Sequence, residues 1–77
     1  MELKEEIRQI IADILKIPAE SFCYDTEAGD IDAWDSMNNV LILSTLEDKF
    51  DIMFPEDDLF DLVSVDAIAE EIQKLKS

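Results

Sequence analysis

Three aspartates, Asp30, Asp32 and Asp35, form the first group of side chains whose spacing could perform chemistry. A helix–loop–helix calcium site needs oxygen ligands at alternate positions, a glycine at the sixth position and a glutamate at the twelfth. Counted from Asp30, the sixth position is Asp35 and the twelfth is Leu41, and a register that starts five residues earlier also fails. We therefore expect weak, unspecific binding of divalent ions by these carboxylates and no built metal site.

Two nucleophilic side chains, Ser36 and Cys23, are the next candidates for chemistry. A serine hydrolase needs a general base beside its serine and hydrogen-bond donors for an oxyanion. The chain has no histidine, and Lys49 is the single basic residue between positions 17 and 73. Cys23 also lacks an imidazole partner, and we expect it to be a small, half-buried residue beside Phe22. Self-contained catalysis is not expected, so the chain is not predicted to be an enzyme.

Ser36 lies at the predicted start of a helix and follows a long loop, which leaves two interpretations of its hydroxyl. A serine at a helix start usually caps the helix, because its oxygen accepts a hydrogen bond from a free backbone amide. Alternatively, the hydroxyl is exposed and carries a phosphodiester, since the amides and the dipole at a helix N-terminus stabilise an anion. In the first interpretation the hydroxyl oxygen accepts a hydrogen bond from the backbone, and in the second it is exposed and unbonded.

A helix and a long loop precede Ser36 in the sequence and must position it. Apolar residues recur at spacings of three and four from Leu3 to Leu15, which predicts a helix with one apolar stripe. Because Pro18 disfavours helical geometry at the preceding residue, this helix should end near Lys16. No helical period continues over residues 19–34, and we predict a long ordered loop there. Its expected anchors in the core are Phe22, Tyr24, Ile31 and Trp34.

Three further helices are predicted beyond the loop. Asp35 and Ser36 open the second, Pro55 with the acids behind it predicts a short third helix through about Asp61, and Ser64 should cap a fourth. The expected core stripe of the second helix is Val40, Leu43, Leu46 and Phe50. The predicted fold class is all-α, a small four-helix bundle of three main helices and one short helix with a long first loop. It is expected to form one domain over residues 1–77.

Acidic residues dominate the composition, with 20 aspartates and glutamates against 6 lysines and arginines and a formal net charge of −14. This charge repels nucleic acid and anionic membranes, and no apolar run approaches the length of a bilayer span. The acids form either an ordinary solvated face or a docking surface for basic proteins. The single cysteine is typical of a reducing compartment, and the acidic N-terminus is unlike a targeting peptide. We therefore predict a cytoplasmic protein without membrane insertion, and we expect it to be a monomer.

The sequence around Ser36 resembles a known motif. Residues 34–37, Trp-Asp-Ser-Met, are similar to the Asp-Ser-Leu motif of acyl carrier proteins, in which the serine carries 4′-phosphopantetheine. The similarity continues through residues 46–51, 54–58 and 64–65, which resemble the second-, third- and fourth-helix segments of that family. Before Asp35 only the lengths of the helix and the loop agree. The resemblance therefore covers nearly the whole chain.

This resemblance implies a carrier and not a catalyst. A phosphopantetheinyl transferase would move 4′-phosphopantetheine from coenzyme A to the hydroxyl of Ser36, beside Asp35 of the motif. Acyl-loading, acyl-transfer or condensing enzymes with basic docking surfaces would then act on the thioester. Because the reactive thiol arrives with the cofactor, the chain needs no catalytic residue of its own. The acids expected to contact these partners are Glu47, Asp48, Glu56 and Asp57.

In this family the acyl chain can fold back between the helices. The residues of this chain that are candidates for such a lining are expected to belong to the ordinary core in any case. They are Val40, Leu46, Phe50, Phe54, Leu62, Ile68 and Ile72.

Met37, Asn38 and Leu41 depart from the pattern of carriers that serve general fatty-acid synthesis. Those carriers usually have leucine directly after the serine and acids two and five residues after it. At about 100° per residue, Met37 and Leu41 lie one turn apart beside the Ser36 end of the helix. Leu41 either widens the core contact or, with Met37 and Asn38, is recognised by the enzymes of a dedicated biosynthetic pathway. We hypothesise the second.

One alternative function belongs to another class. An acidic helical adaptor would bind a basic partner without covalent modification, and it would show the same composition and the same helices. The two functions differ in whether an arm is attached to Ser36. Fatty acyl, hydroxyacyl, polyketide and aminoacyl cargoes all agree equally well with the motif.

Overall fold

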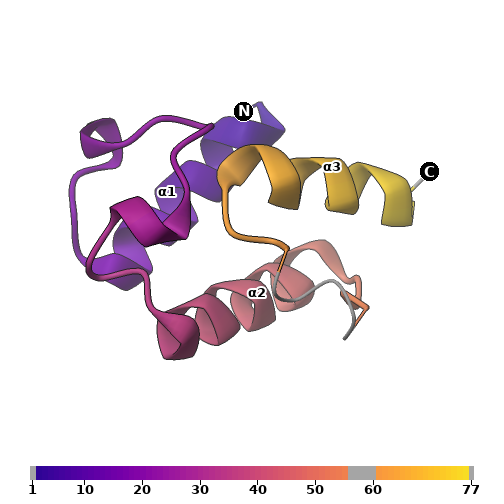
Figure 1. Cartoon of the computed structure of the whole chain (residues 1–77). Helices are drawn as coiled ribbons and strands as arrows, with labels where there is room; N and C mark the ends of the chain where they lie inside the picture. Colours follow the sequence, from indigo (N-terminus) through magenta and orange to yellow (C-terminus); the bar gives the residue numbers. More distant parts are fainter. Residues whose placement is uncertain (1, 56–60, 77) are drawn as a thin grey trace.

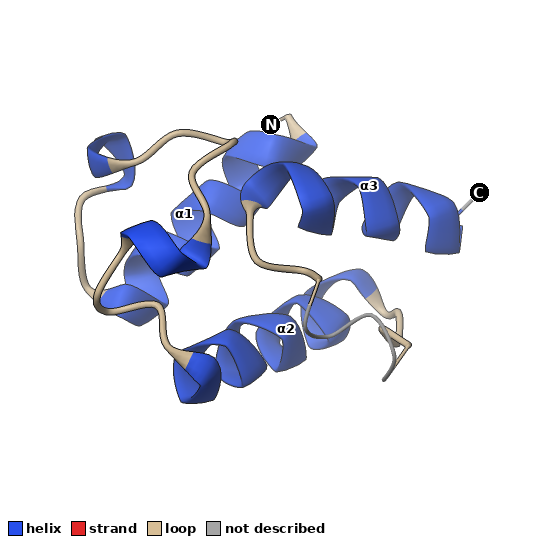
Figure 2. Cartoon of the chain, in the orientation of Figure 1, coloured by secondary structure: helices blue, strands red, loops and turns tan. Residues whose placement is uncertain are grey.

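The structure, a computed structural model, describes residues 2–55 and 61–76. In these residues it contains helices and loops and no strand (Figure 2). The helices are α1 (Leu3–Leu15), α2 (Ser36–Phe50) and α3 (Val65–Lys76). The all-α fold class is confirmed, as are the first, second and last predicted helices. The predicted short third helix, from Pro55 to about Asp61, lies mostly on residues outside the described ranges.

Helix α1 organises the core because it packs against both α2 and α3 (Figure 1). The centre of its apolar stripe is fully or almost fully buried, as its spacing of three and four predicts, and Leu3, Ile10 and Ile14 at its margins are partly buried. Burial of an aliphatic side chain of this size stabilises the fold by about 1.5–3 kcal/mol. The stripes that meet are Ile7, Ile11, Ala12 and Leu15 from α1, Ile42, Leu43 and Leu46 from α2, and Val65, Ile68, Ala69 and Ile72 from α3.

The ends of the helices follow local backbone rules. Helix α1 ends at Lys16, which adopts a left-handed conformation with φ of 59° and donates its N–H to the carbonyl of Ala12. This end agrees with the effect of Pro18 on the residue before it. Asp51 ends α2 in the same way, with φ of 54°. At the start of α3, Ser64 Oγ accepts the N–H of Ala67 at 3.2 Å, which confirms the predicted cap.

The loop between α1 and α2 is ordered and contains two single 3₁₀ turns, Ala19–Ser21 and Ala28–Asp30. The sequence predicted neither turn, because one isolated turn is too short to produce a helical period. Two of the predicted anchors, Phe22 and Trp34, are buried in the core. The other two anchors, Tyr24 and Ile31, are partly buried against it.

A polar cluster ties this loop to α1. The hydroxyl of Tyr24 donates to Glu5 Oε1 at 2.8 Å, and the guanidinium of Arg8 lies 5.1 Å from the centre of the Tyr24 ring. Hydrogen bonds from Gln9 and Tyr24, with Arg8 nearby, hold the pKa of Glu5 below its ordinary value. The bond to Glu5 raises the pKa of Tyr24. The loop is thus fixed to α1 at its middle.

The same loop is also bonded to the segment before α3 and to the first turn of α3. The N–H of Ala28 donates to the carbonyl of Val63 at 2.8 Å, and the N–H of Asp66 donates to the carbonyl of Tyr24 at 3.0 Å. These two bonds join residues that are 35 and 42 positions apart in the sequence. The loop is therefore held from both sides before it reaches α2.

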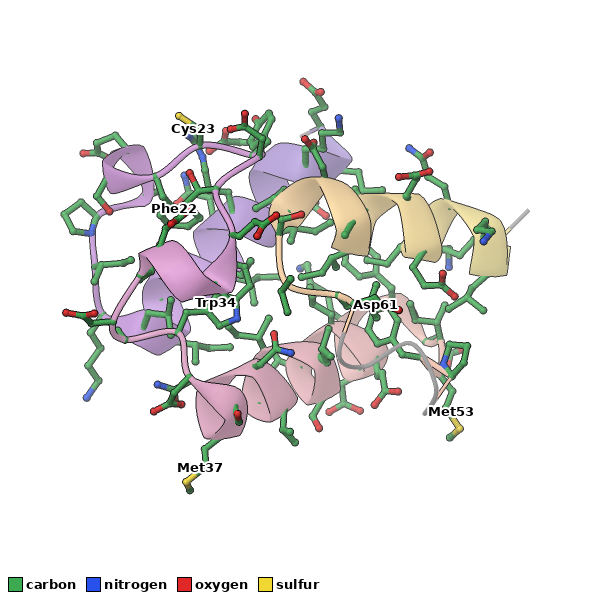
Figure 3. All side chains as sticks on the ribbon, viewed as in Figure 1. Phe22, Cys23, Trp34, Met37, Met53 and Asp61 are labelled. Atoms are coloured by element: carbon green, nitrogen blue, oxygen red, sulfur yellow. The ribbon has the colours of Figure 1, made fainter. Side chains whose placement is uncertain are left out.

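Cys23 is exposed and projects from the surface of the loop (Figure 3). The half-buried position predicted for it is wrong. The backbone is extended at Phe22, and in extended chain successive side chains point to opposite sides. Since Phe22 is buried, its neighbour Cys23 faces solvent.

No helix in the described part of the chain is both long enough and apolar enough to cross a bilayer.

Candidate functional site

The N-terminus of α2 is capped by Asp35 and not by Ser36. Asp35 is extended, and its Oδ1 accepts the backbone N–H of Asn38 at 2.9 Å. Its carbonyl oxygen accepts the N–H of Asn39 at 2.8 Å, which is the first hydrogen bond of the helix. Asp35 thus performs the capping that one interpretation of the sequence assigned to the serine. That interpretation of Ser36 is wrong.

Ser36 is the first residue of α2, and its side chain is exposed. Within residues 2–55 and 61–76 its hydroxyl makes no hydrogen bond, so the oxygen is free to be modified. The first turn of α2 contains no acidic residue, and the helix dipole places partial positive charge at this end. A phosphate group attached at this position would be favourably placed.

The turn that precedes Ser36 is held by two asparagines of the first turn of α2. Asn38 Nδ2 donates to the carbonyl of Ala33 at 2.6 Å, and Trp34 Nε1 donates to Asn39 Oδ1 at 2.8 Å. Trp34 is only 3% exposed and lies between the loop and α2 (Figure 3). Because the last two residues of the turn, Ala33 and Trp34, are both bonded to α2, the end of the loop is held against the start of the helix.

A pocket of about 360 Å³ opens directly beside Ser36. It lies between the end of the loop, the first two turns of α2 and the segment before α3. Apolar side chains form most of its wall, and the polar residues Asp35 and Ser36 belong to its exposed margin. The lining residues are Ala28, Trp34, Asp35, Ser36, Asn39, Val40, Leu43 and Val63.

This pocket is not the one that the sequence suggested for an acyl chain. Of the seven candidate lining residues, Val40 alone is in its wall. Phe50 and Ile72 instead line a second hollow of about 400 Å³ at the other end of α2. The other four, Leu46, Phe54, Leu62 and Ile68, are buried, and of these Leu62 also lines a third hollow of about 220 Å³ beside α3.

An apolar patch of Met37, Val40 and Leu41 lies on the surface of α2 next to Ser36. The exposed fractions are 82%, 58% and 52%, respectively, and Met37 points away from the body of the protein (Figure 3). The prediction that Val40 belongs to the core is wrong, since Ile42 is buried in its place. Four consecutive apolar residues at 40–43 surround the helix, so the period could not determine which of them faces inward.

The remaining residues predicted to contact partners differ in their surroundings. Asp48 is exposed, whereas Glu47 is partly buried and its Oε2 accepts the N–H of Phe54 at 2.8 Å. Asn38, as described above, donates its amide to the loop. Glu56 and Asp57 lie outside the described residues. Among the positions that are described, no three acidic or cysteine side chains come close enough to hold a metal ion.

Sequence reasoning missed the part played by Asn39 and Val63 in this site. Asn39 bonds the indole of Trp34, and Val63 closes the pocket through its bond with Ala28. Contacts across a loop–helix junction, or between distant segments, follow no periodic rule. The one available signal was the asparagine pair beside the Asp-Ser motif, because asparagine is a common bonding partner for backbone near helix starts.

Comparison with known proteins relates the chain to a sequence family and to a solved structure. Residues 5–72 match the sequence profile of the family described as "Phosphopantetheine attachment site". The fold is similar to the solution NMR structure of holo acyl carrier protein from Geobacter metallireducens, with a TM-score of 0.83 and 26% sequence identity. The alignment covers 99% of this chain and 87% of that one.

Proposed function

The chain belongs to the phosphopantetheine attachment site family, and we propose that Ser36 is its attachment residue. The observation that carries this proposal is the division of tasks at the start of α2. Asp35 caps the helix through Oδ1, so the adjacent Ser36 hydroxyl is exposed and unbonded within the described structure. The hydroxyl oxygen is therefore accessible to a transferase.

The chain is an acyl carrier, and it holds acyl groups as thioesters on covalently attached 4′-phosphopantetheine. It is a carrier and not an enzyme. Its partners include a phosphopantetheinyl transferase and acyl-handling enzymes. The arm supplies the thiol, and the tasks of the chain are to anchor the arm, to favour its phosphate and to present the thioester. At the α2 N-terminus, the free amides and the helix dipole favour the phosphate at Ser36.

Intact mass spectrometry tests the attachment. After incubation with coenzyme A and a broad-specificity transferase, the wild-type chain should gain one phosphopantetheine, and Ser36→Ala should gain none. Ser44→Ala is a matched control, because Ser44 is an exposed serine of the same helix and its loss should leave the modification intact. No addition to the wild type would favour the acidic adaptor over the carrier.

We further propose that the apolar patch of Met37, Val40 and Leu41 contacts the acyl-handling enzymes of a dedicated pathway. The patch lies in the first two turns of the helix that begins at Ser36, so an enzyme that binds around the attachment residue would contact it. The first eleven residues of α2 carry no charge, and the acids begin at Glu47 and Asp48. Basic groups of the partner are therefore expected opposite that more distant end of the helix.

Leu41→Glu tests this contact. A carboxylate in the centre of a desolvated apolar interface is costly, so loading by the pathway's own enzyme should slow by about tenfold or more. Gln73→Glu introduces the same charge at an exposed position of α3 and should have little effect. Equal loading of Leu41→Glu and wild type would contradict the proposed contact.

The proposal also covers the remaining candidate contact residues and the state in which the chain works. Glu56 and Asp57 are expected to add to the acidic docking surface with Asp48. The remaining candidates, Asn38 and Glu47, are expected to act by fixing the local backbone, since their side chains are bonded internally. The chain is proposed to work as a monomer in the cytoplasm.

A further inference from the structure

The end of the loop before Ser36 is joined to the segment before α3 by a continuous series of hydrogen bonds. The N–H of Ala28 donates to the carbonyl of Val63 at 2.8 Å, and the N–H of Ile31 donates to the carbonyl of Ala28 at 3.1 Å. The N–H of Trp34 then donates to the carbonyl of Ile31 at 3.0 Å. These bonds therefore hold the residue two positions before Ser36.

Two asparagines join the end of this series to α2. Trp34 Nε1 donates to Asn39 Oδ1 at 2.8 Å, and Asn38 Nδ2 donates to the carbonyl of Ala33 at 2.6 Å. The two amides act in opposite senses. An indole N–H can only donate, so Asn39 must accept, and a carbonyl can only accept, so Asn38 must donate. The two bonds thus connect the residues on either side of the segment 35–37, which contains the attachment residue.

Both bonds restrain the first turn of α2. The backbone amides of Asn38 and Asn39 bond to the side chain and the carbonyl of Asp35, respectively. Because Asp35 is exposed, water competes for its cap, and helix ends held only in this way fray. Trp34 is buried, and a buried indole N–H that loses its partner is costly. The bond from Asn39 to Trp34 therefore connects this exposed turn to the core.

We propose that Asn38 and Asn39 are positioning residues for the transfer of phosphopantetheine to Ser36. The inference rests on the proposed attachment at Ser36. In the transfer, Ser36 Oγ forms a bond to the phosphorus next to the pantetheine of coenzyme A, and the bond from that phosphorus to the bridging oxygen breaks. Adenosine 3′,5′-bisphosphate leaves, and the serine proton passes to a base of the transferase. The asparagines touch none of these atoms and act by keeping the first turn of α2 helical, so that the hydroxyl meets the phosphorus in a fixed geometry.

Steady-state kinetics of a broad-specificity transferase on the apo chain measure this role. Asn38→Ala removes the donor to Ala33, and Asn39→Leu removes the acceptor for Trp34. Each should lower kcat by about threefold to tenfold, which corresponds to the loss of one hydrogen bond. The apolar patch is intact in both variants, so KM for the chain should change little. A raised KM at constant kcat would show that the transferase contacts the asparagines directly, and it would overturn the positioning role.

Two aspartate substitutions separate the hydrogen bonds from charge. Asn38→Asp and Asn39→Asp add the same negative charge at neighbouring positions of α2. The first loses the donor that the carbonyl of Ala33 requires, whereas the second keeps an oxygen for the indole of Trp34. The kcat of Asn39→Asp should therefore exceed that of Asn38→Asp by about threefold or more. Gln73→Glu makes the same change of amide to carboxylate at an exposed position of α3 and should leave kcat and KM unchanged.

NMR hydrogen exchange of the same apo variants relates the rate to the structure. The chain has one tryptophan, and its indole hydrogen should exchange several-fold faster in Asn39→Leu than in wild type. The backbone amides of Asn38 and Asn39, which bond to Asp35, should also exchange several-fold faster in each slow variant. The amides of the buried residues Ile11 and Ile68 should exchange as in wild type. This contrast distinguishes local opening of the first turn from a loss of global stability.

The outcomes separate this proposal from the attachment itself. A wild-type kcat in both Asn38→Ala and Asn39→Leu, or equal kcat in the two aspartate variants, overturns the positioning role and leaves attachment at Ser36 intact. Slow transfer with unchanged exchange in the first turn of α2 overturns it as well. If the wild-type chain gains no phosphopantetheine, both proposals fail.

Discussion

Two adjacent residues, Asp35 and Ser36, determine what the start of α2 can do. A helix start exposes several backbone amides, and one side chain usually satisfies one of them. Asp35 does so from outside the helix, and Ser36 follows it as the first helical residue. The serine therefore has helical geometry and lies in the electrostatic field of the helix N-terminus, while its oxygen is not needed for the cap. The Asp-Ser order thus has a structural reason as well as a chemical one.

Replacement of Asp35 tests this arrangement. Asp35→Ala removes the acceptor for the Asn38 amide and should lower the free energy of unfolding by about 1 kcal/mol. Asp35→Asn keeps an oxygen at the same position and should stay within a few tenths of a kcal/mol of the wild type. Urea denaturation of the three proteins measures the difference. Equal losses in both variants would show that charge, and not the cap, is what matters at this position.

The residues that we propose for the attachment site could be named from the sequence, whereas the side chains that support them could not. Ser36 and Asp35 are recognisable because they form a short contiguous motif beside a helix start. The bonds of Asn38 to Ala33 and of Asn39 to Trp34 depend on how the loop returns to the helix. That path is set by contacts with α1 and with the segment before α3, and no local pattern encodes it.

At the scale of the elements, the cluster of Glu5, Arg8 and Tyr24 connects α1 to the loop that positions the site. Glu5 accepts hydrogen bonds from Tyr24, Arg8 and Gln9, and these donors favour its ionised form. Its pKa in the folded chain is therefore lowered. A carboxylate with a lowered folded pKa stabilises the fold above its unfolded pKa, about 4.3, and loses that contribution as the pH falls through the folded value.

The lowered pKa of Glu5 predicts how the stability of the Glu5→Gln variant depends on pH. The difference in unfolding free energy between wild type and Glu5→Gln should be largest near neutral pH and should shrink below about pH 4. Glu6→Gln removes the same charge one residue away and leaves the hydrogen bonds of Glu5 in place, so it is the control for the loss of charge alone. Urea denaturation at several pH values measures both. Parallel curves for the two variants would contradict the role assigned to the Glu5 cluster.

The C-terminal end of α2 provides another test at this scale. Asp51 has a left-handed conformation, which glycine adopts without steric cost. Asp51→Gly should raise the free energy of unfolding by about 0.5–1 kcal/mol. Asp48→Gly, inside the same helix, should lower it by about 1 kcal/mol. Both changes remove one negative charge, so an equal effect in urea denaturation would mean that charge dominates over conformation.

The bounds of the elements were more predictable than the orientation of α2. Pro18 and the caps Asp35 and Ser64 leave local signatures, so the ends of the helices agree with prediction. Because residues 40–43 are all apolar, the sequence does not determine which side of α2 faces the core. The packed structure shows that Ile42 is buried and Val40 is exposed. The apolar patch beside Ser36 could therefore be found only in part from sequence.

At the scale of the whole molecule, the charge of −14 is carried by a body of 30 × 27 × 19 Å. At about 0.01 M salt the Debye length is about 30 Å, so each carboxylate interacts with charges across the whole molecule. Few cations are placed to offset this repulsion, and the ion pair of Lys4 with Asp66 at 2.9 Å lies at the surface. Surface pairs of this kind contribute little.

Salt should therefore stabilise the chain. Between about 0.01 M and 1 M sodium chloride, where the Debye length falls from about 30 Å to about 3 Å, the melting temperature should rise by several degrees. Thermal denaturation followed by circular dichroism measures this, and most of the rise should occur at the low end of the range. An unchanged melting temperature would mean that self-repulsion does not limit the stability of this fold.

The most direct test of the carrier function is to locate the arm on the chain. Trypsin should release residues 17–49 of the modified protein as one peptide, which contains Ser21, Ser36 and Ser44. Fragmentation of this peptide in the mass spectrometer distinguishes the three serines. We expect one phosphopantetheine on every modified molecule, at Ser36. An arm on Ser21 or Ser44, or a peptide that stays unmodified after complete reaction conditions, would contradict it.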